Sequence, residues 1–148
     1  LRLARQLADV EAIEVVEKLV SDKSAQVRRE CAIALRHVKT DQGAKLWAEL
    51  ATRHDGEDRW YLEALGLSSD LNADACFAAW LDKVGSKWNT PAGRDVIWRV
   101  RAKGAPAYLA KILKDKNTPP ETHPRYIRAL DFHSGPERDK ALEALLDI

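Results

Sequence analysis

Hydrophobic positions along the chain repeat with a period of about 31 residues, and each period holds two helical stretches. One set of apolar positions steps by 31 residues, and a second set steps by 30, 35 and 30. The first set comprises Val16, Trp47, Ala78 and Leu109, flanked by Leu19, Leu50, Leu81 and Ile112; the second comprises Leu35, Leu65, Val100 and Leu130. A fixed period in the thirties with two helices in each unit is typical of a helical solenoid. The pattern therefore predicts an architecture and no particular chemistry.

Apolar residues within each unit recur at the spacing of amphipathic helices, and no useful stretch alternates with the period of two expected of a strand. The predicted helices span 10–20, 25–38, 42–53, 57–67, 72–84, 93–102, 105–115, 122–133 and, as a final half-unit, 135–146. Ser24 is the expected N-cap of the second helix. Pro119 and Pro120 suit the start of the eighth, because proline is excluded from helix interiors.

The second helix of each unit has neighbouring positions that we expect to point in different directions. The expected core-facing positions are Ala32, Leu62, Ile97 and Ile127, and those pointing towards a groove or solvent are Ile33, Glu63, Trp98 and Arg128. Trp47 and Trp80 lie on first-helix stripes and are expected in the core. Only one or two of Trp60 and its two neighbours can face inward, and Trp88, in a polar loop, either plugs a groove or awaits a ligand.

Composition indicates one folded domain spanning 1–148. The 148 residues are 45% hydrophobic and 32% charged, which fits neither a disordered nor a membrane-spanning chain. The 24 basic and 23 acidic residues leave a net charge of +1, which argues against a dedicated polyanion binder. Residues 1–74 sum to −3 and 75–148 to +4, with the cations concentrated in 94–128.

The chain has no Met and begins inside an apparent helix, so we expect it to be a piece of a longer protein. Apolar surface near residues 1–20 would then be covered by an upstream unit. No run approaches the ~20 apolar residues of a membrane span, and no membrane contact is expected.

The turn and second helix of the first unit resemble a HEAT repeat. That family places an Asp in the turn and a Val-Arg pair at the start of the second helix, where this chain has Asp22, Val27 and Arg28. Arg59, Arg94 and Arg125 take the place of the arginine in the later units. The resemblance implies a right-handed α-α superhelix of about 4.5 HEAT-like helical hairpins.

Three strings, RWYLEALGL, GRDVIWRVRA and RYIRALDF followed by GPERDKAL, are similar to the HEAT segment of large bacterial proteins classed as membrane-bound dehydrogenases. Those proteins often carry a separate c-type cytochrome domain whose CxxCH lies outside the HEAT segment. The resemblance implies a spacer or docking module of an exported protein, in the periplasm or cell envelope. No catalytic residue carries over from it.

No set of residues in the chain matches a catalytic, cofactor or metal motif. Cys31 and Cys76 lie in helical patterns of different repeats and are expected to be buried, inert thiols. The four histidines, at 37, 54, 123 and 133, form no i,i+4 pair and have no clustered carboxylates. The acids Glu57-Asp58, Asp55 and Asp70 lie in predicted turns, where carboxylates are usually solvated. No nucleophile elbow and no Gly-rich phosphate loop occurs in the sequence. We therefore expect a domain that is not an enzyme and holds neither cofactor nor metal.

The recurring arginines have two interpretations. They hold successive units in register by pairing with turn carboxylates and carbonyls, Asp22 with Arg28 being the best such pair, or they form a ladder of cations that grips an acidic partner. Trp98 is either an interface anchor or is packed on Arg94 or Arg101. The candidate partner-binding residues are Arg59, Glu63, Arg94, Trp98, Arg101, Arg125 and Arg128, and the structural residues are Asp22 and Arg28.

The sequence favours a non-catalytic protein-interaction or structural scaffold, with other domains of the same chain or a separate protein as the partner. The alternative is a HEAT-like nucleic-acid-binding or DNA glycosylase domain, suggested by Trp98 and the basic segment 94–128. The acidic balance of 1–74 argues against nucleic acid, because such proteins carry a basic footprint over the whole domain. A third hypothesis, a cofactor-handling HEAT module, would need a groove carboxylate or an accessible thiol.

Overall fold

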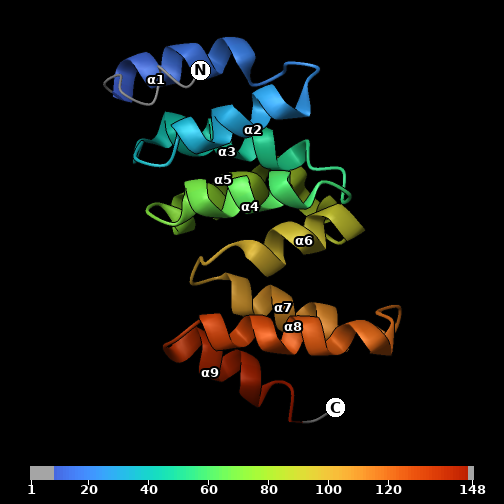
Figure 1. The fold of residues 1–148 in the computed structure, drawn as a ribbon. Helices are drawn as coiled ribbons and strands as arrows, with labels where there is room; N and C mark the ends of the chain where they lie inside the picture. The colour runs from blue at the N-terminus through green and yellow to red at the C-terminus, as the bar shows by residue number, and fades with distance from the viewer. Residues whose placement is uncertain (1–8, 147–148) are drawn as a thin grey trace.

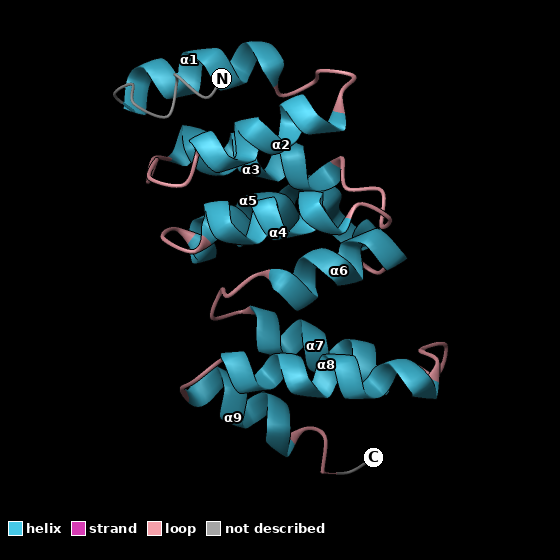
Figure 2. Cartoon of the chain, viewed as in Figure 1, coloured by secondary structure: helices cyan, strands magenta, loops and turns pink. Residues whose placement is uncertain are grey.

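The computed structural model describes residues 9–146, where nine α-helices follow one another (Figure 1) and no strand occurs (Figure 2). The helices are α1 (Asp9–Leu19), α2 (Ala25–Ala34), α3 (Asp41–Thr52), α4 (Arg59–Ser69), α5 (Ala73–Val84), α6 (Pro91–Arg99), α7 (Ala105–Lys114), α8 (His123–Ala129) and α9 (Pro136–Glu143). Three 3₁₀ turns are interposed: η2 (Gly85–Trp88), η3 (Pro120–Thr122) and η4 (Leu130–Phe132). The predicted all-α class is confirmed for this part of the chain. None of its helices has both the length and the apolar character needed to cross a membrane.

Every predicted helix is present, and the largest differences lie at two helix ends. The helix predicted over 25–38 ends at Ala34, because the Leu35 amide hydrogen already bonds back to the carbonyls of Cys31 and Ala32 in a tightened last turn. The helix predicted over 122–133 is divided into η3, α8 and η4. Pro124 lies in the first turn of α8, where its missing amide hydrogen is tolerated.

Side chains cap the N-termini of four helices, α2, α3, α4 and α6. In each case the capping oxygen accepts a hydrogen bond from the backbone amide three residues later. The pairs are Ser24–Val27 at 3.4 Å, Thr40–Gly43 at 3.1 Å, Asp58–Tyr61 at 3.0 Å and Thr90–Gly93 at 3.1 Å. Each cap satisfies an amide that has no partner within the helix, and contributes roughly 0.5–2 kcal/mol. The predicted Ser24 cap is confirmed.

Most of the closest helix pairs are second neighbours along the chain, which places the helices in two layers. In one layer α3 packs most closely against α5, and α7 against α9; in the other α2 packs against α4, and α4 against α6. Figure 1 shows α4 in front of α5 and α8 in front of α7, with the elements stacked in chain order from α1 to α9. We call α1, α3, α5, α7 and α9 the odd layer, and α2, α4, α6 and α8 the even layer.

The apolar series that repeats along the even layer is buried as predicted. Its members Leu35, Leu65, Val100 and Leu130 are all at most 3% exposed. The odd-layer series is buried at Val16, Trp47 and Leu109, whereas its member Ala78 is exposed. The inward face of α5 carries Cys76 and Trp80. Ala78 is two positions from each of them, which places it about 160° away around the helix, on the outer face.

Buried polar side chains join α3 to α4 within one repeat. The Trp47 indole Nε1–H donates to the Leu65 carbonyl at 2.9 Å and to Ser68 Oγ at 3.1 Å. The Tyr61 hydroxyl donates to the Leu50 carbonyl at 2.9 Å. These bonds satisfy the polar atoms of two large core side chains and fix the rotation of α4, which sets what its outer face presents.

The tryptophans divide between core and surface. Trp47 and Trp80 are core residues, as predicted. Trp88 is half-buried and packs edge-on against Tyr108, with ring centroids 5.1 Å apart, so it fills space between η2 and α7. Trp60 is 70% exposed.

The uncovered apolar surface predicted near residues 1–20 falls partly on residues 1–8, which lie outside the described residues. Within the described part, Ala12, Val16 and Val20 are buried.

Candidate functional site

Charge is divided between the two layers of helices. The even-layer helices carry seven arginines, no lysine and three acidic residues, a net charge of +4. The odd-layer helices carry six lysines, one arginine and eleven acidic residues, a net charge of −4. The sequence comparison of chain halves missed this division, and adding up charge over alternate helices would have found it.

Four of the seven even-layer arginines are held by groups of this chain. Arg28 Nη1 donates to the carbonyls of Asp22 at 2.7 Å and Lys23 at 3.0 Å, and its guanidinium lies 5.5 Å from the Tyr61 ring on the next even helix. The predicted contact between Asp22 and Arg28 therefore exists, but through the Asp22 backbone. The Asp22 carboxylate instead accepts from the Ser24 amide at 2.8 Å.

Arg94 joins α6 to the turn after α7. Its guanidinium donates to Asn89 Oδ1 at 2.7 Å, Thr118 Oγ1 at 2.8 Å and Asp115 Oδ2 at 2.6 Å, and its side chain is only 13% exposed. Thr118 Oγ1 in turn donates to the Ile112 carbonyl at 2.6 Å. The structure thus places Arg94, a candidate partner-binding residue, in a structural network.

Arg101, another candidate, is also turned towards the protein. Its Nη1 donates to the Trp98 carbonyl at 2.9 Å, and its guanidinium lies 4.6 Å from the centre of the Phe132 ring. Burial, with the nearby Arg99 charge, lowers the pKa of Arg101 from its usual value. Burial and the Arg101 charge lower the pKa of His133 to about 4, so this imidazole is neutral at pH 7.

A pocket of about 230 Å³ opens between α4, α6 and α8, and we call it the central pocket. Its lining includes four of the predicted partner-binding residues: Arg59, Glu63, Trp98 and Arg125. Glu63 Oε2 accepts from Arg99 Nε at 2.9 Å. The structure therefore brings together side chains that lie up to 66 positions apart in the sequence.

Asp95 is the acidic centre of the central pocket, and the sequence analysis missed it. Its Oδ1 accepts from Arg125 Nη2 at 2.6 Å, and its Oδ2 bonds His54 Nε2 at 3.2 Å. Burial opposes ionisation of Asp95, but the hydrogen bonds from His54 and Arg125 outweigh it and hold the carboxyl pKa below its usual range. His54 is 41 residues away in the sequence, so no local spacing could have signalled this pair.

Trp98 forms one wall of the central pocket and is half-buried. The Arg125 guanidinium lies 4.5 Å from the ring centre of Trp98. The expected cation–π contact is thus present, but its cation comes from α8 and not from Arg94 or Arg101. This contact and the bond to Asp95 hold Arg125 in place, although its side chain is 42% exposed.

A second hollow, of about 560 Å³, lies between α2 and α4, and we call it the apolar groove. Its apolar lining is Ile33, Trp60, Ala64 and Leu67, and its charged rim is Arg29, Glu30 and Glu63. Trp60 is 70% exposed and Leu67 40% exposed. Glu63 lines both hollows, so the apolar groove and the central pocket form one continuous surface of the even layer.

The C-terminal end of this surface is apolar as well. Ile127 on α8 is 52% exposed, so its predicted core-facing position is wrong. In the shortened α8 the neighbouring Tyr126 takes the buried position instead. Arg128 is exposed, as predicted.

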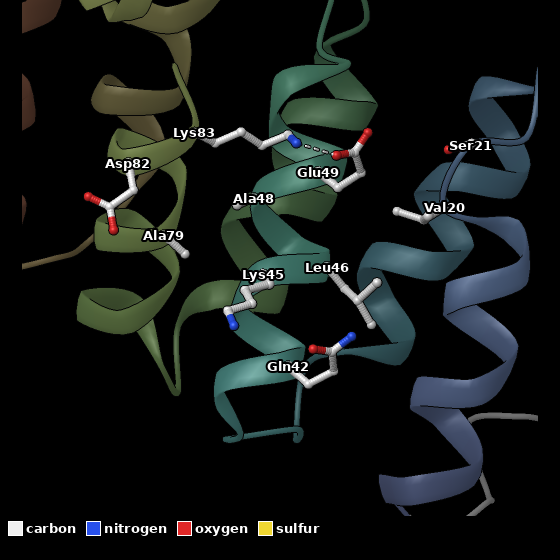
Figure 3. Close-up of a pocket in the computed structure, with 10 residues that line it drawn as sticks. All are labelled: Val20, Ser21, Gln42, Lys45, Leu46, Ala48, Glu49, Ala79, Asp82 and Lys83. Carbon is white, nitrogen blue, oxygen red and sulfur yellow. Dashed lines mark ion pairs between the residues drawn. The ribbon is translucent and has the colours of Figure 1, made fainter. Parts of the chain in front are cut away.

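A hollow of about 780 Å³ lies on the odd layer, over α3 (Figure 3). Lys83 of α5 reaches towards α3 to pair with Glu49 at 2.6 Å (Figure 3). Arg53 binds the other oxygen of that carboxylate at 3.0 Å. The Lys83 hydrogen bond leads the effects that lower the Glu49 pKa. This hollow is open, and its most prominent charges neutralise one another.

Groups suited to nucleophilic or metal chemistry are not gathered in this surface. Cys31 and Cys76 are buried as predicted, and burial raises their pKa values to about 11 and about 12, so both are protonated thiols at pH 7. Among the described residues, no group of three or more His, Cys, Asp or Glu is placed to hold a metal ion.

No protein-family model, curated protein or solved structure matches this chain. The chemistry of the even-layer surface is therefore the best guide to function.

Proposed function

We propose that this chain is a non-catalytic interaction module that binds a protein partner on the outer surface of its even layer. The observation that carries the proposal is Trp60, a large aromatic side chain that is 70% exposed beside an apolar groove and a charged pocket. Exposed tryptophan and arginine are the side chains most enriched among interface residues that dominate binding. Contiguous exposed apolar surface rimmed by charge marks interaction sites.

The finer architecture is part of this proposal. We propose that the two layers form a right-handed superhelix of about 4.5 HEAT-like hairpins, in which the even layer lines the binding surface. The 31-residue period, the side-chain caps of α2, α4 and α6, and the packing of α3 on α5, α2 on α4, α7 on α9 and α4 on α6 support it. Such arrays use an extended surface of stacked repeats to bind partners.

The wider setting rests on the family resemblance of the three sequence strings. We propose that the module belongs to a larger bacterial protein with a c-type cytochrome domain, exported to the periplasm or cell envelope. Its partner is then another domain of that chain or a separate protein. A signal sequence and a CxxCH motif in the same gene would support this setting, and a gene with neither would contradict it.

The arrangement of the central pocket supports binding over catalysis. Both oxygens of the Asp95 carboxylate are occupied, one by Arg125 and one by His54. Glu63 is held by Arg99, and the third acid of the lining, Glu57, is exposed in the turn before α4. The bonds to His54 and Arg125 hold the pKa of the Asp95 carboxyl below its usual range, which makes this carboxylate a weak general base.

One observation favours the alternative of a nucleic-acid-binding or DNA glycosylase domain. Asp95, Trp98 and Arg125 share one pocket on a surface whose cations are all arginines. Stacking on tryptophan and charge pairing with arginine are both used to bind nucleic acids. The aliphatic lining of the neighbouring apolar groove fits a protein better, so nucleic acid is kept as an outcome of the test.

A random-peptide phage selection against the immobilised chain tests the proposal. We expect selected peptides to lose about thirtyfold in affinity on Trp60→Ala, as for the loss of about 2 kcal/mol at an interface anchor. The matched control is Leu146→Ala, which trims another exposed apolar side chain at the far end of the described chain, 82% exposed. Thermal melting should confirm that both variants fold.

Two results would overturn the proposal. The first is that no enriched peptide depends on Trp60. The second is that labelled single-stranded or duplex DNA binds the same surface more tightly than any peptide, with an affinity that falls steeply with salt. This second result would replace the protein partner with a nucleic acid.

A further inference from the structure

We infer that the segment that binds the even layer is an acidic peptide with an apolar anchor side chain. The inference rests on the proposed function, because it specifies the chemistry of the partner at the same surface. The anchor would lie in the apolar groove against Trp60, and carboxylates on either side would pair with arginines at its edges.

Three arginines of the even-layer helices have no hydrogen-bond or ion-pair partner among the described residues. No hydrogen bond or ion pair joins Arg29, Arg59 or Arg128 to any other described residue, whereas the other four even-layer arginines are engaged. The acids of the even layer are all engaged too: Arg99 binds Glu63, Arg125 binds Asp95, and Glu30 is not free. The available charge of the even-layer helices themselves is therefore entirely positive, although Glu57, in the turn before α4, adds an exposed negative charge to the lining of the central pocket.

Two of the three unpaired arginines line the two neighbouring hollows of the even layer. Arg29 is on the rim of the apolar groove, and Arg59 lines the central pocket next to it. Arg59 is also the residue immediately before Trp60 in α4. A partner side chain placed on Trp60 would thus have an unpaired guanidinium within one or two residues along the partner segment.

The basic residues of the even-layer helices are arginines, which bind carboxylates differently from lysines. A guanidinium presents a planar fork of donors that matches a carboxylate in two parallel hydrogen bonds, while an ammonium acts as a point charge. All seven basic residues of the even-layer helices are arginines, and six of the seven in the odd-layer helices are lysines. The surface with the unpaired charge is therefore the one whose chemistry suits carboxylates.

The lining of the apolar groove favours an acidic peptide over a polyphosphate as the partner. The apolar groove is lined by Ile33, Ala64 and Leu67, which offer a phosphate backbone nothing to bind. A peptide that alternates apolar and acidic side chains can place each where the surface suits it.

The test is the composition of the selected peptides and its reversal. Peptides that depend on Trp60 should be enriched in Asp and Glu relative to the unselected library, and should bind at least about tenfold more weakly to the double variant Arg29→Glu/Arg59→Glu. A new selection against that variant should yield peptides rich in Lys and Arg. The matched control is Lys45→Glu/Lys114→Glu, with the same change of charge on exposed odd-layer residues, which should keep the original acidic preference.

The outcomes separate this inference from the proposed function. Trp60-dependent peptides with no enrichment in acids, or equal losses in the two double variants, would overturn the acidic partner and leave the protein-binding surface standing. An absence of Trp60-dependent peptides would overturn both. Competition by a labelled oligonucleotide that outbinds every peptide would also overturn the inference, in favour of a polyphosphate.

Discussion

Gly66 in the middle of α4 offers a sharp test of how the even layer is packed. A β-carbon built on Gly66 would collide with the guanidinium of Arg99, which lies across α4 from the next even helix. Glycine in a helix interior costs about 1 kcal/mol relative to alanine, so the chain accepts a weaker helix at this point. The close approach of Arg99 is the physical reason for the glycine.

The expected effect of Gly66→Ala follows from two opposing contributions. Helix propensity alone should stabilise the protein by about 1 kcal/mol. Displacing Arg99 breaks its bond to Glu63, made at 2.9 Å between side chains that are 14% and 31% exposed. Hydrogen bonds to charged groups contribute about 1.5–3 kcal/mol, so we expect a net destabilisation of about 0.5–2 kcal/mol.

The assay is a double-mutant cycle of urea unfolding followed by circular dichroism. In an Arg99→Ala background the collision is gone, and Gly66→Ala should instead raise the free energy of unfolding by about 0.5–1 kcal/mol. Ala78→Gly is the control, because Ala78 is an exposed helical residue that contacts neither partner. It should lower the free energy of unfolding by a similar amount in both backgrounds.

The reasoning would be refuted if Gly66→Ala changed stability with the same sign and size whether or not Arg99 is present. Such a result would mean that Arg99 does not occupy the surface of α4, and the contact between Glu63 and Arg99 in the central pocket would fall with it.

Three further predictions concern the core, the central pocket and the thiols. Leu65→Ala and Leu130→Ala should each lower the free energy of unfolding by about 2–5 kcal/mol in urea titrations, and a change below about 0.5 kcal/mol would mean that the assigned burial is wrong. Because folding lowers the pKa of Asp95, its ionised form stabilises the protein above the unfolded pKa of about 4; the stability difference between wild type and Asp95→Asn should therefore be fully present above that pKa and shrink as pH falls below about 4. Cys31 and Cys76 should react with Ellman's reagent at pH 8 only when urea unfolds the chain, and rapid labelling of the native protein would contradict their burial.

The sequence was sufficient for those features that depend on local periodicity. The spacing of apolar residues predicted every helix of the described part, and the Ser24 cap followed from one residue and its position. Leu35, Leu65 and Leu130 were placed in the core because repeats at a fixed period put equivalent residues at equivalent depths.

The failures share a physical cause, which is rotation of a helix about its axis. The 31-residue period placed Ala78 with Trp47, yet α5 presents Trp80 to the core, and Ala78 is exposed. The repeat pattern predicts that Ile127 faces the core, but Tyr126 is buried instead, because prolines shorten α8 and change its start. A shift of one residue turns a helix by about 100°, which a repeat pattern of imperfect length does not resolve.

The central pocket was only half predictable, because its contacts join separate repeats. Arg59, Glu63, Trp98 and Arg125 were found from their equivalent positions on second helices. Asp95 occupies a position that the repeat pattern does not mark, and its partners come from other repeats. Nothing in the sequence distinguished the engaged arginines from the free ones.

The near-neutral net charge conceals the property of this chain that bears most on partners. The total of +1 argues against a dedicated polyanion binder, but within it the helices of the two layers carry +4 and −4, which cancel, and residues outside these helices supply the remaining +1. Opposite charges on two sides of a molecule produce a field that orients an approaching charged partner even when the total is close to zero. An acidic segment would be drawn to the even layer and repelled by most of the odd layer. The cations of the even layer that remain unpaired lie where the apolar groove and the central pocket meet and on α8, so long-range attraction and short-range contacts select the same surface.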